Sequence, residues 1–216
     1  MLDKVPDGHG VDFRPIICIG RQLGSGGHDI GRLLASDFNA QYYDKEILKL
    51  AAQESGFSKE FFEQNDERHG FLHTILHTRA FHVSDQAFYQ NNFSQEGLFK
   101  FQSDAIRKAA SEGACVFVGR CADYVLRDFK NVVSIFITAS MQVRIANVMK
   151  RNGVEADEAR KIIEQGERRR AEYYNYYTGK KWGAAESYDL CIDSGILGTD
   201  ETEKLIAGFI RNRFMR

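Results

Sequence analysis

The sequence predicts an α/β fold in which a parallel sheet carries helices on both faces. Short apolar runs typical of strands alternate with longer amphipathic segments typical of helices, and this order indicates successive strand–helix units with parallel strands. The runs at 15–19 and 114–118 are continuously apolar, as expected for strands that are buried on both faces. A chain of 216 residues is long enough for one domain of this kind.

Four strand–helix pairs, a short strand before Asp44 and one further helix at 155–177 are expected along the chain. The pairs are 16–19 with 27–38, 115–118 with 122–129, 132–137 with 140–152, and 190–192 with 199–211. The segment at about 56–100 is rich in Phe, His, Asn and Gln and lacks a strong strand. We interpret it as a mostly helical insertion into a core formed by 14–55 and 101–216.

Composition and charge exclude several classes of protein. Apolar residues make up 43% of the chain with only 2 Pro, which supports a folded core and argues against disorder. The 29 Lys and Arg against 30 Asp and Glu give a net charge of -1, so no bulk field attracts nucleic acid or an anionic membrane. No run approaches the ~18 apolar residues of a membrane helix, and residues 1–15 contain no signal-like apolar stretch. We therefore expect a cytoplasmic protein.

The four cysteines form no CxxC pair. Cys18, Cys115 and Cys191 lie in apolar runs predicted to be buried strands, and Cys121 lies just beyond one such run. We expect free thiols in a reducing compartment rather than disulfides. Burial raises the pKa of a thiol, so none of these cysteines is a candidate nucleophile.

A glycine-rich loop joins the first expected strand to the first expected helix. Its residues are Gly24, Ser25, Gly26 and Gly27, followed by His28 and Asp29 at the helix start. Glycines let successive backbone N–H groups turn toward one point, and a helix N-terminus adds unpaired donors and a partial positive charge. The alternative is a tight strand-to-helix turn without a ligand. The place directly after a buried strand favours a phosphate site.

The loop lacks the lysine of the phosphate-binding sequence GxxxxGK[ST]. With Gly26 as the second glycine, the first falls on Arg21, the lysine position on Gly27 and the hydroxyl position on His28. Spacing alone leaves open whether Arg21 or His28 replaces the missing ammonium. We favour Arg21, because its charge is permanent whereas a histidine is mostly neutral near pH 7.

Further motifs follow the loop in order along the chain. The blocks are Ile-Cys-Ile-Gly-Arg-Gln-Leu-Gly-Ser-Gly-Gly at 17–27, Tyr-Tyr-Asp-Lys-Glu-Ile-Leu at 42–48, Val-Gly-Arg-Cys-Ala-Asp-Tyr at 118–124, Ile-Phe-Ile-Thr-Ala at 135–139, Glu-Arg-Arg-Arg-Ala-Glu-Tyr-Tyr at 167–174 and Tyr-Thr-Gly-Lys-Lys-Trp-Gly at 177–183. This set resembles the cytidylate-kinase-like proteins, P-loop relatives of CMP kinase. CMP kinases carry Gly-Lys and Gly-Arg-Asp where this chain has Gly26-Gly27 and Gly119-Arg120-Cys121.

The resemblance implies a P-loop NTPase fold of the nucleoside monophosphate kinase type, with a monophosphate-binding insertion and a lid at about 155–183. It also implies ATP and Mg²⁺ as cofactors. Arg170 matches the family's arginine before a tyrosine pair, and it would close over the transferred group. The resemblance further suggests that Asp44 contacts the nucleoside, although a helix N-cap would explain this residue equally well.

Arg120 directly follows a buried strand, at the sheet edge where open α/β proteins bind ligands. This position suits a residue that holds the acceptor phosphate, and the alternative is a surface arginine that caps a loop. Three other arginines fit a solvated helix face as well as a phosphate site: Arg160, Arg168 and Arg169. For Arg144 we favour a structural role over contact with the nucleotide base.

We favour a structural role for a group of histidines and for a group of aromatic residues. His69, His73 and His77 recur every four residues but lack a further ligand, so a role in the insertion or in a subunit contact is favoured over a metal site. An aromatic stripe could stack a base, yet packing is the favoured role. Its members are Tyr173, Tyr174, Tyr176, Tyr177 and Trp182.

These features predict a phosphotransferase that moves the γ-phosphoryl group of ATP to a nucleoside monophosphate, with CMP as the favoured acceptor. Arg21, Arg120 and Arg170 are the expected catalytic residues, and Ser25 and Asp29 are candidates for reaching Mg²⁺. We expect no nucleic acid or membrane partner, and a homodimer stays open. The alternatives are a nucleotide-binding regulator without turnover and a P-loop kinase for another small metabolite.

Overall fold

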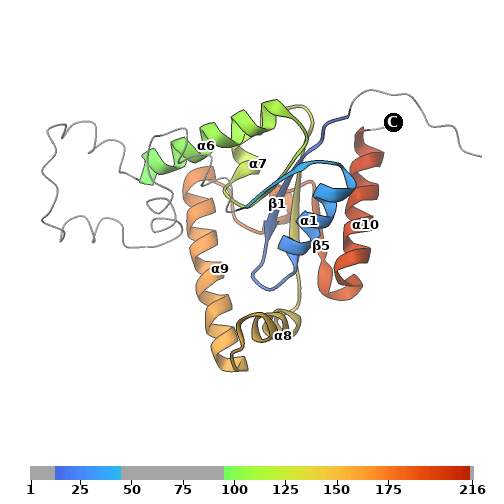
Figure 1. Cartoon of the computed structure of the whole chain (residues 1–216). Helices are drawn as coiled ribbons and strands as arrows, with labels where there is room; N and C mark the ends of the chain where they lie inside the picture. The colour runs from blue at the N-terminus through green and yellow to red at the C-terminus, as the bar shows by residue number, and fades with distance from the viewer. Residues whose placement is uncertain (1–12, 45–94, 215–216) are drawn as a thin grey trace, which may run out of the picture.

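The computed structural model describes residues 13–44 and 95–214, which contain one parallel sheet with helices on both sides (Figure 1). The sheet has five strands in the order β2-β3-β1-β4-β5, and every pairing between them is parallel. The strands are β1 Ile16–Arg21, β2 Gln41–Tyr43, β3 Cys115–Val118, β4 Val132–Thr138 and β5 Leu190–Asp193. The predicted α/β class is confirmed.

The helices of the described residues connect these strands and cover the sheet. They are α1 Gly27–Asp37, α6 Gln95–Glu112, α7 Ala122–Val125, α8 Met141–Asn152, α9 Ala156–Thr178 and α10 Ser194–Phe214, with a short 3-10 helix at Ala185–Ser187. None of them combines the length and apolar character needed to cross a bilayer.

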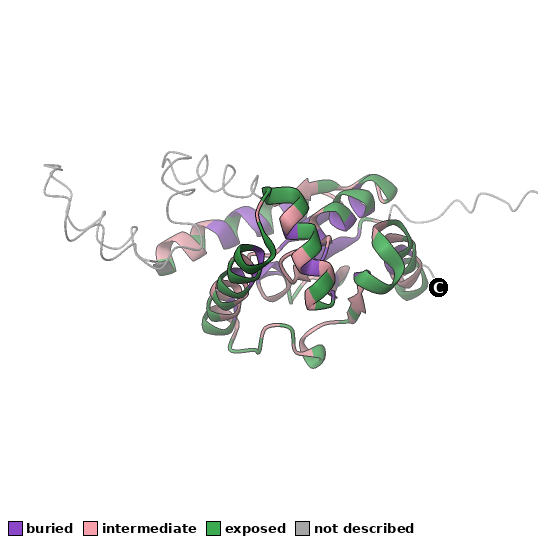
Figure 2. Ribbon diagram, turned by 90° about the horizontal axis from the view of Figure 1, so that it is seen from below, coloured by how far each residue is buried: buried purple, intermediate pink, exposed green. Residues whose placement is uncertain are grey.

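Two apolar layers hold the helices on the sheet. Because side chains alternate along a strand, Ile16 and Cys18 of β1 pack on one face with α6 and α7, whereas Ile17 and Ile19 pack on the other face with α1 and α10. Figure 2 shows buried segments in the centre of the molecule and exposed segments on its outside. The central strand is therefore covered on both faces, as the continuous apolar run at 15–19 predicts.

The strand order reverses direction at β1. After β1 the chain forms β2 at the edge of the sheet and then β3, which lies directly beside β1. It then crosses to the other side of β1 and forms β4 and β5. In open α/β sheets ligands bind at this point, outside the carboxyl ends of the strands. Here the glycine loop follows β1 and Gly119 follows β3, so both lie at that edge.

α8 and α9 form a helical pair with a small core of their own. Val148, Ala159 and Ile163 are fully buried between them, and Leu23 of the glycine loop packs against this cluster. The hydroxyl of Ser140 caps α8 by accepting a hydrogen bond from the Val143 N–H at 3.4 Å. The helix expected at 155–177 is thus observed as α9, within one residue at each end.

The observed bounds depart from the expected ones at two helices. α7 ends at Val125 instead of continuing to 129, because the chain must turn to bring Asn131 beside β1, where its carbonyl accepts from the Ile16 N–H at 3.0 Å. α10 begins at Ser194 rather than 199 and is broken at Gly198, where φ is 77°. Part of the predicted insertion also belongs to α6, which begins at Gln95.

The prediction of cysteines in buried strands is correct for Cys18 and Cys115 and wrong for Cys191. Cys18, Cys115 and Cys121 are buried, whereas Cys191 is exposed. The reason is topological, since β5 lies at the edge of the sheet and has a poorly covered face. An apolar run of three residues does not distinguish an edge strand from a central one.

We expect only Cys191 to react with a thiol reagent in the native protein. Burial raises the pKa of Cys18, Cys115 and Cys121, and for Cys115 the value reaches about 12. The thiolate is the reactive species, so these three residues should stay unmodified until the protein unfolds. Partial burial also raises the pKa of Cys191, so its reaction should accelerate at alkaline pH. Thiol titration with and without guanidinium, followed by mass spectrometry, checks this; native labelling of Cys18 would contradict it.

Candidate functional site

The loop between β1 and α1 takes a conformation that depends on glycine at two positions. Gly24 and Gly26 have φ of 87° and 76°, in the left-handed region that side chains disfavour. At Gly24 a Cβ would also lie 2.7 Å from the Arg144 carbonyl oxygen of α8. Gly26 is the N-cap of α1. The loop is therefore pressed against α8 and delivers its end directly to a helix N-terminus.

Carbonyl oxygens of the loop are used as acceptors inside the protein. Ser25 Oγ donates to the Gln22 carbonyl at 2.9 Å, and Ser194 Oγ donates to the Ser25 carbonyl at 2.6 Å. Asn147 Nδ2 donates to the Gly24 carbonyl at 2.8 Å. The first backbone N–H groups of α1 have no acceptor within the helix. With its carbonyls engaged and amides at the helix start, the loop has the chemistry of an anion site.

Arg21 occupies the space in which a lysine at position 27 would begin. A Cβ on Gly27 would lie 2.6 Å from Arg21 Cβ and 3.0 Å from its Cγ, so any side chain there would collide with the arginine. The Arg21 side chain extends from there to Gly119 at the end of β3, where a Cβ would meet its Nη1. The glycine at the lysine position is thus explained by the arginine that crosses it.

Asp44 follows β2 and lies between the side chains of Arg21 and His28. Its Oδ1 is 3.8 Å from Arg21 Nη2, and its Oδ2 is 3.5 Å from His28 Nε2. The other imidazole nitrogen of His28 lies 3.6 Å from Asp29 Oδ1. Asp44 therefore contacts the loop, while the helix that it would cap lies outside the described residues.

A pocket opens beside the glycine loop at the carboxyl edge of the sheet. It is lined by three arginines from separate parts of the chain: Arg21, Arg120 and Arg170. Its other walls are Asp123 and the rings of Tyr173, Tyr174, Trp182 and Tyr188. The empty space, open mouth included, is about 500 Å³. The structure thus brings together the three predicted catalytic residues, whose guanidinium groups suit an anion, beside the aromatic rings of the pocket.

Arg120 lies in a strained segment of backbone. Gly119, Arg120 and Cys121 have consecutive φ values of 84°, 61° and 54°. Each residue other than glycine in this region costs of order 1–3 kcal/mol, and such strain clusters at ligand sites. Burial lowers the pKa of the Arg120 guanidinium, and Arg21 adds to that effect, but a guanidinium stays protonated. The alternative of an exposed surface arginine does not fit this position.

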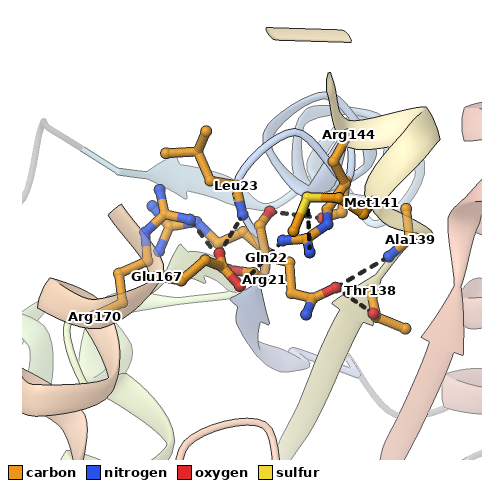
Figure 3. A network of polar contacts seen from close by, with 10 residues as sticks. Arg21, Gln22, Leu23, Thr138, Ala139, Met141, Arg144, Glu167 and Arg170 are labelled. Atoms are coloured by element: carbon orange, nitrogen blue, oxygen red, sulfur yellow. Dashed lines mark hydrogen bonds and ion pairs between the residues drawn. The ribbon is translucent and has the colours of Figure 1, made fainter. Parts of the chain in front are cut away.

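Arg170 reaches the loop from α9. Its Nη1 donates to the Arg21 carbonyl oxygen at 3.2 Å, so the helix lies close to the end of β1 (Figure 3). Arg160 and Arg168 of the same helix are exposed, as a solvated helix face predicts. Arg170 alone among these three lines the pocket.

Sequence analysis missed the contacts that hold several residues of the site in place. Tyr174 donates to Asp123 Oδ2 at 2.7 Å, and burial raises the pKa of the Asp123 carboxyl although this hydrogen bond opposes the shift. Arg144, in the first half of α8, is buried and lies 3.1 Å from Glu167 Oε2. No spacing in the sequence connects residues from such distant elements. The signals in the sequence were the motif at 118–124, which contains Asp123, and the motif at 167–174, which contains Glu167 and Tyr174.

The aromatic stripe combines packing with pocket lining. Trp182 meets Phe136 edge-on with ring centroids 5.2 Å apart, while Tyr173 and Tyr177 pack against Phe99. Among the described residues no three or more His, Cys, Asp or Glu side chains gather into a possible metal site. His69, His73 and His77 lie outside the described residues.

Comparison with known proteins agrees with this geometry. The model of the Cytidylate kinase-like family matches residues 16–196. A cytidylate kinase of Methanopyrus kandleri is 25% identical over 204 residues, which cover 90% of this chain and 92% of that protein. A cytidylate kinase of Pyrococcus horikoshii is also 25% identical, over 181 residues that cover 83% and 79%.

Solved structures share the architecture. An uncharacterized protein from Eubacterium ventriosum is 29% identical with a TM-score of 0.67, covering 91% of this chain and 98% of that one. Shikimate kinase from Acinetobacter baumannii, in complex with shikimate, has a TM-score of 0.52 at 10% identity, over 95% and 97% of the two chains. The latter likeness shows the fold alone, which is that of P-loop kinases. Since the family model spans most of the chain and its site motifs, this protein belongs to the cytidylate kinase-like family.

Proposed function

We propose that this protein transfers the γ-phosphoryl group of ATP to a nucleoside monophosphate, with CMP as the favoured acceptor. The observation that carries the proposal is the convergence of Arg21, Arg120 and Arg170 on one pocket beside the glycine loop. Phosphoryl transfer is catalysed almost entirely by positioning and charge stabilisation, and it needs no protein nucleophile. The relatives named cytidylate kinase support a nucleotide as the acceptor.

The donor side of the reaction is assigned to the loop. Backbone amides between Gly24 and His28 would hold the phosphates of ATP, because the loop carbonyls are engaged elsewhere. The Ser25 amide is excluded from this set, since it donates to the Gln22 carbonyl at 3.3 Å. Arg21 would follow the charge on the γ-phosphoryl oxygens in place of the absent lysine. Its guanidinium cannot lose its proton, so it would stabilise this charge at any physiological pH.

The acceptor side is assigned to the pocket. Arg120 would bind the acceptor phosphate through paired N–H donors, and Arg170 would approach the transferred group from α9. Tyr173, Trp182 and Tyr188 offer ring faces beside them. Asp123 supplies a buried carboxylate that can accept hydrogen bonds from the acceptor.

Magnesium would arrive with the nucleotide and neutralise charge on its phosphates. Asp29 fits this role better than Ser25, because its side chain is 73% exposed on the first turn of α1. Ser25 is only 2% exposed, and its hydroxyl donates to the Gln22 carbonyl within the loop.

A coupled assay of ADP release tests the proposed function. The acceptors are CMP, UMP, AMP, GMP and a hydroxylated metabolite such as shikimate, and ATP alone is the control. We expect the fastest ADP release with CMP. ATP binding in calorimetry without ADP release from any acceptor would instead identify a regulator, and turnover with the hydroxylated acceptor alone would identify another small-molecule kinase. Absence of ATP binding would reject every nucleotide function.

The Arg21→Ala variant should lower kcat at least about tenfold, a barrier change near 1.4 kcal/mol, because it removes the cation assigned to the γ-phosphoryl group. His28→Ala should have a smaller effect, since this half-exposed imidazole lies between two carboxylates. Steady-state kinetics at saturating ATP measures both. The assignment fails if activity survives Arg21→Ala and collapses in His28→Ala.

A lysine should function at position 27 only after Arg21 is removed. Gly27→Lys alone should lose activity, because its Cβ would collide with the Arg21 side chain. Arg21→Gly clears the space completely, whereas Arg21→Ala would leave the Cβ in place. The double variant Arg21→Gly/Gly27→Lys should therefore be more active than Arg21→Gly. Equal kcat values for these two variants would show that the ammonium cannot take over the role of Arg21.

Arg120→Ala should weaken the acceptor more than ATP. Loss of a charge-assisted bidentate contact costs roughly 2–4 kcal/mol, which should appear as a large rise in the KM for CMP. Calorimetric titration with ATP and CMP separately measures the two affinities. A fall in ATP affinity with unchanged CMP affinity would reverse the assignment of the two subsites.

A further inference from the structure

α9 contacts the glycine loop through two side chains on one face of the helix (Figure 3). The Leu23 backbone N–H donates to Glu167 Oε1 at 2.7 Å, a short bond to a charged acceptor. One turn later, Arg170 Nη1 donates to the Arg21 carbonyl at 3.2 Å. The two contacts join residues 144 and 149 positions apart in the sequence, and they fix the end of β1 and the start of the loop that follows it.

The contact is close at Gly166, in the middle of α9. A Cβ on Gly166 would lie 2.7 Å from Leu23 Cδ1. Glycine in the interior of a helix costs about 1 kcal/mol relative to alanine, so its presence in the middle of α9 is unfavourable for the helix itself. It is explained by Leu23, which packs there and joins the core of α8 and α9.

Glu167 also connects this contact to α8. Its Oε2 is 3.1 Å from Arg144 Nη1, and the two side chains are 19% and 7% exposed. Such poorly hydrated charges depend on each other, because removing one leaves the other buried without compensation. The Arg144 backbone also touches the loop at Gly24. One carboxylate therefore links the loop, α8 and α9.

We propose that Glu167 is a positioning residue, which fixes the glycine loop and Arg144 to α9 and thereby places Arg170 at the pocket. The carboxylate does not compete with the donor phosphates, because Arg144 already neutralises it and Leu23 precedes the amides from Gly24 onward. The catalytic consequence rests on the proposed function, whereas the docking of α9 on the loop does not.

Three variants test the catalytic consequence. Glu167→Ala removes the contacts of this carboxylate with Leu23 and Arg144. It should lower kcat at least about tenfold with little change in the KM for ATP, because the transition-state geometry is lost. Glu167→Gln keeps an oxygen for the Leu23 N–H and should recover part of the rate, to within about threefold to fivefold of the wild type. The control is Glu164→Gln, an exposed acidic residue of the same helix, which should leave kcat unchanged.

Hydrogen exchange tests the docking without any turnover. In nucleotide-free protein, the amides of 21–31 and of α9 should exchange at least about tenfold faster in Glu167→Ala than in Glu164→Gln, with Glu167→Gln between them. If exchange follows this order and the wild type lacks kinase activity, the docking stands and the proposed function fails. Unchanged exchange overturns the docking. Tighter ATP binding by Glu167→Gln would show a carboxylate that competes with phosphate and would overturn the positioning role.

Discussion

The path of the Arg21 side chain across Gly27 is the constraint on which the rest of the site depends. A P-loop holds several negative charges at one point, and backbone amides alone leave the γ-phosphoryl group without a mobile cation. Here the stem of Arg21 fills the space of a side chain at 27 and carries a guanidinium from the end of β1 toward Gly119. In the proposed site, the cation thus comes from the strand instead of from the helix.

The fold makes this arrangement possible because β1 is central. Its carboxyl end lies between those of β3 and β4. Arg21 at the end of β1 and Arg120 just after β3 therefore line the same pocket. α9 then adds Arg170 from above the loop. Arginine suits all three places, since its planar fork matches phosphate oxygens and its charge survives burial. The cost is repulsion between Arg21 and Arg120, which Asp44 reduces and which a bound anion would relieve further.

Sequence reasoning identified the elements better than the contacts between them. Continuous apolar runs sufficed to place β1 and β3, and a shorter β-type run placed β4. Strand-end position singled out Arg120, and the search for a permanent charge in the loop singled out Arg21. The same reasoning predicted too long a helix at α7 and a buried Cys191. An apolar pattern does not indicate where a chain must turn or which strand lies at the edge of the sheet. Sequence analysis gave Glu167 no role, because its contacts with Leu23 and Arg144 depend on how α9 packs. The glycine at 166 is likewise explained only by the packing of Leu23 against it.

A crystal structure with ADP, CMP and aluminium fluoride would test the central claim most directly, because the fluoride imitates the transferred phosphoryl group. The structure described here predicts that Arg21 and Arg170 donate to the fluoride, that Arg120 binds the CMP phosphate, and that Arg21 still crosses Gly27. An Arg21 guanidinium directed to Asp44 and away from the fluoride, with another cation of the chain in its place, would contradict the assignment of Arg21 as the substitute for the lysine.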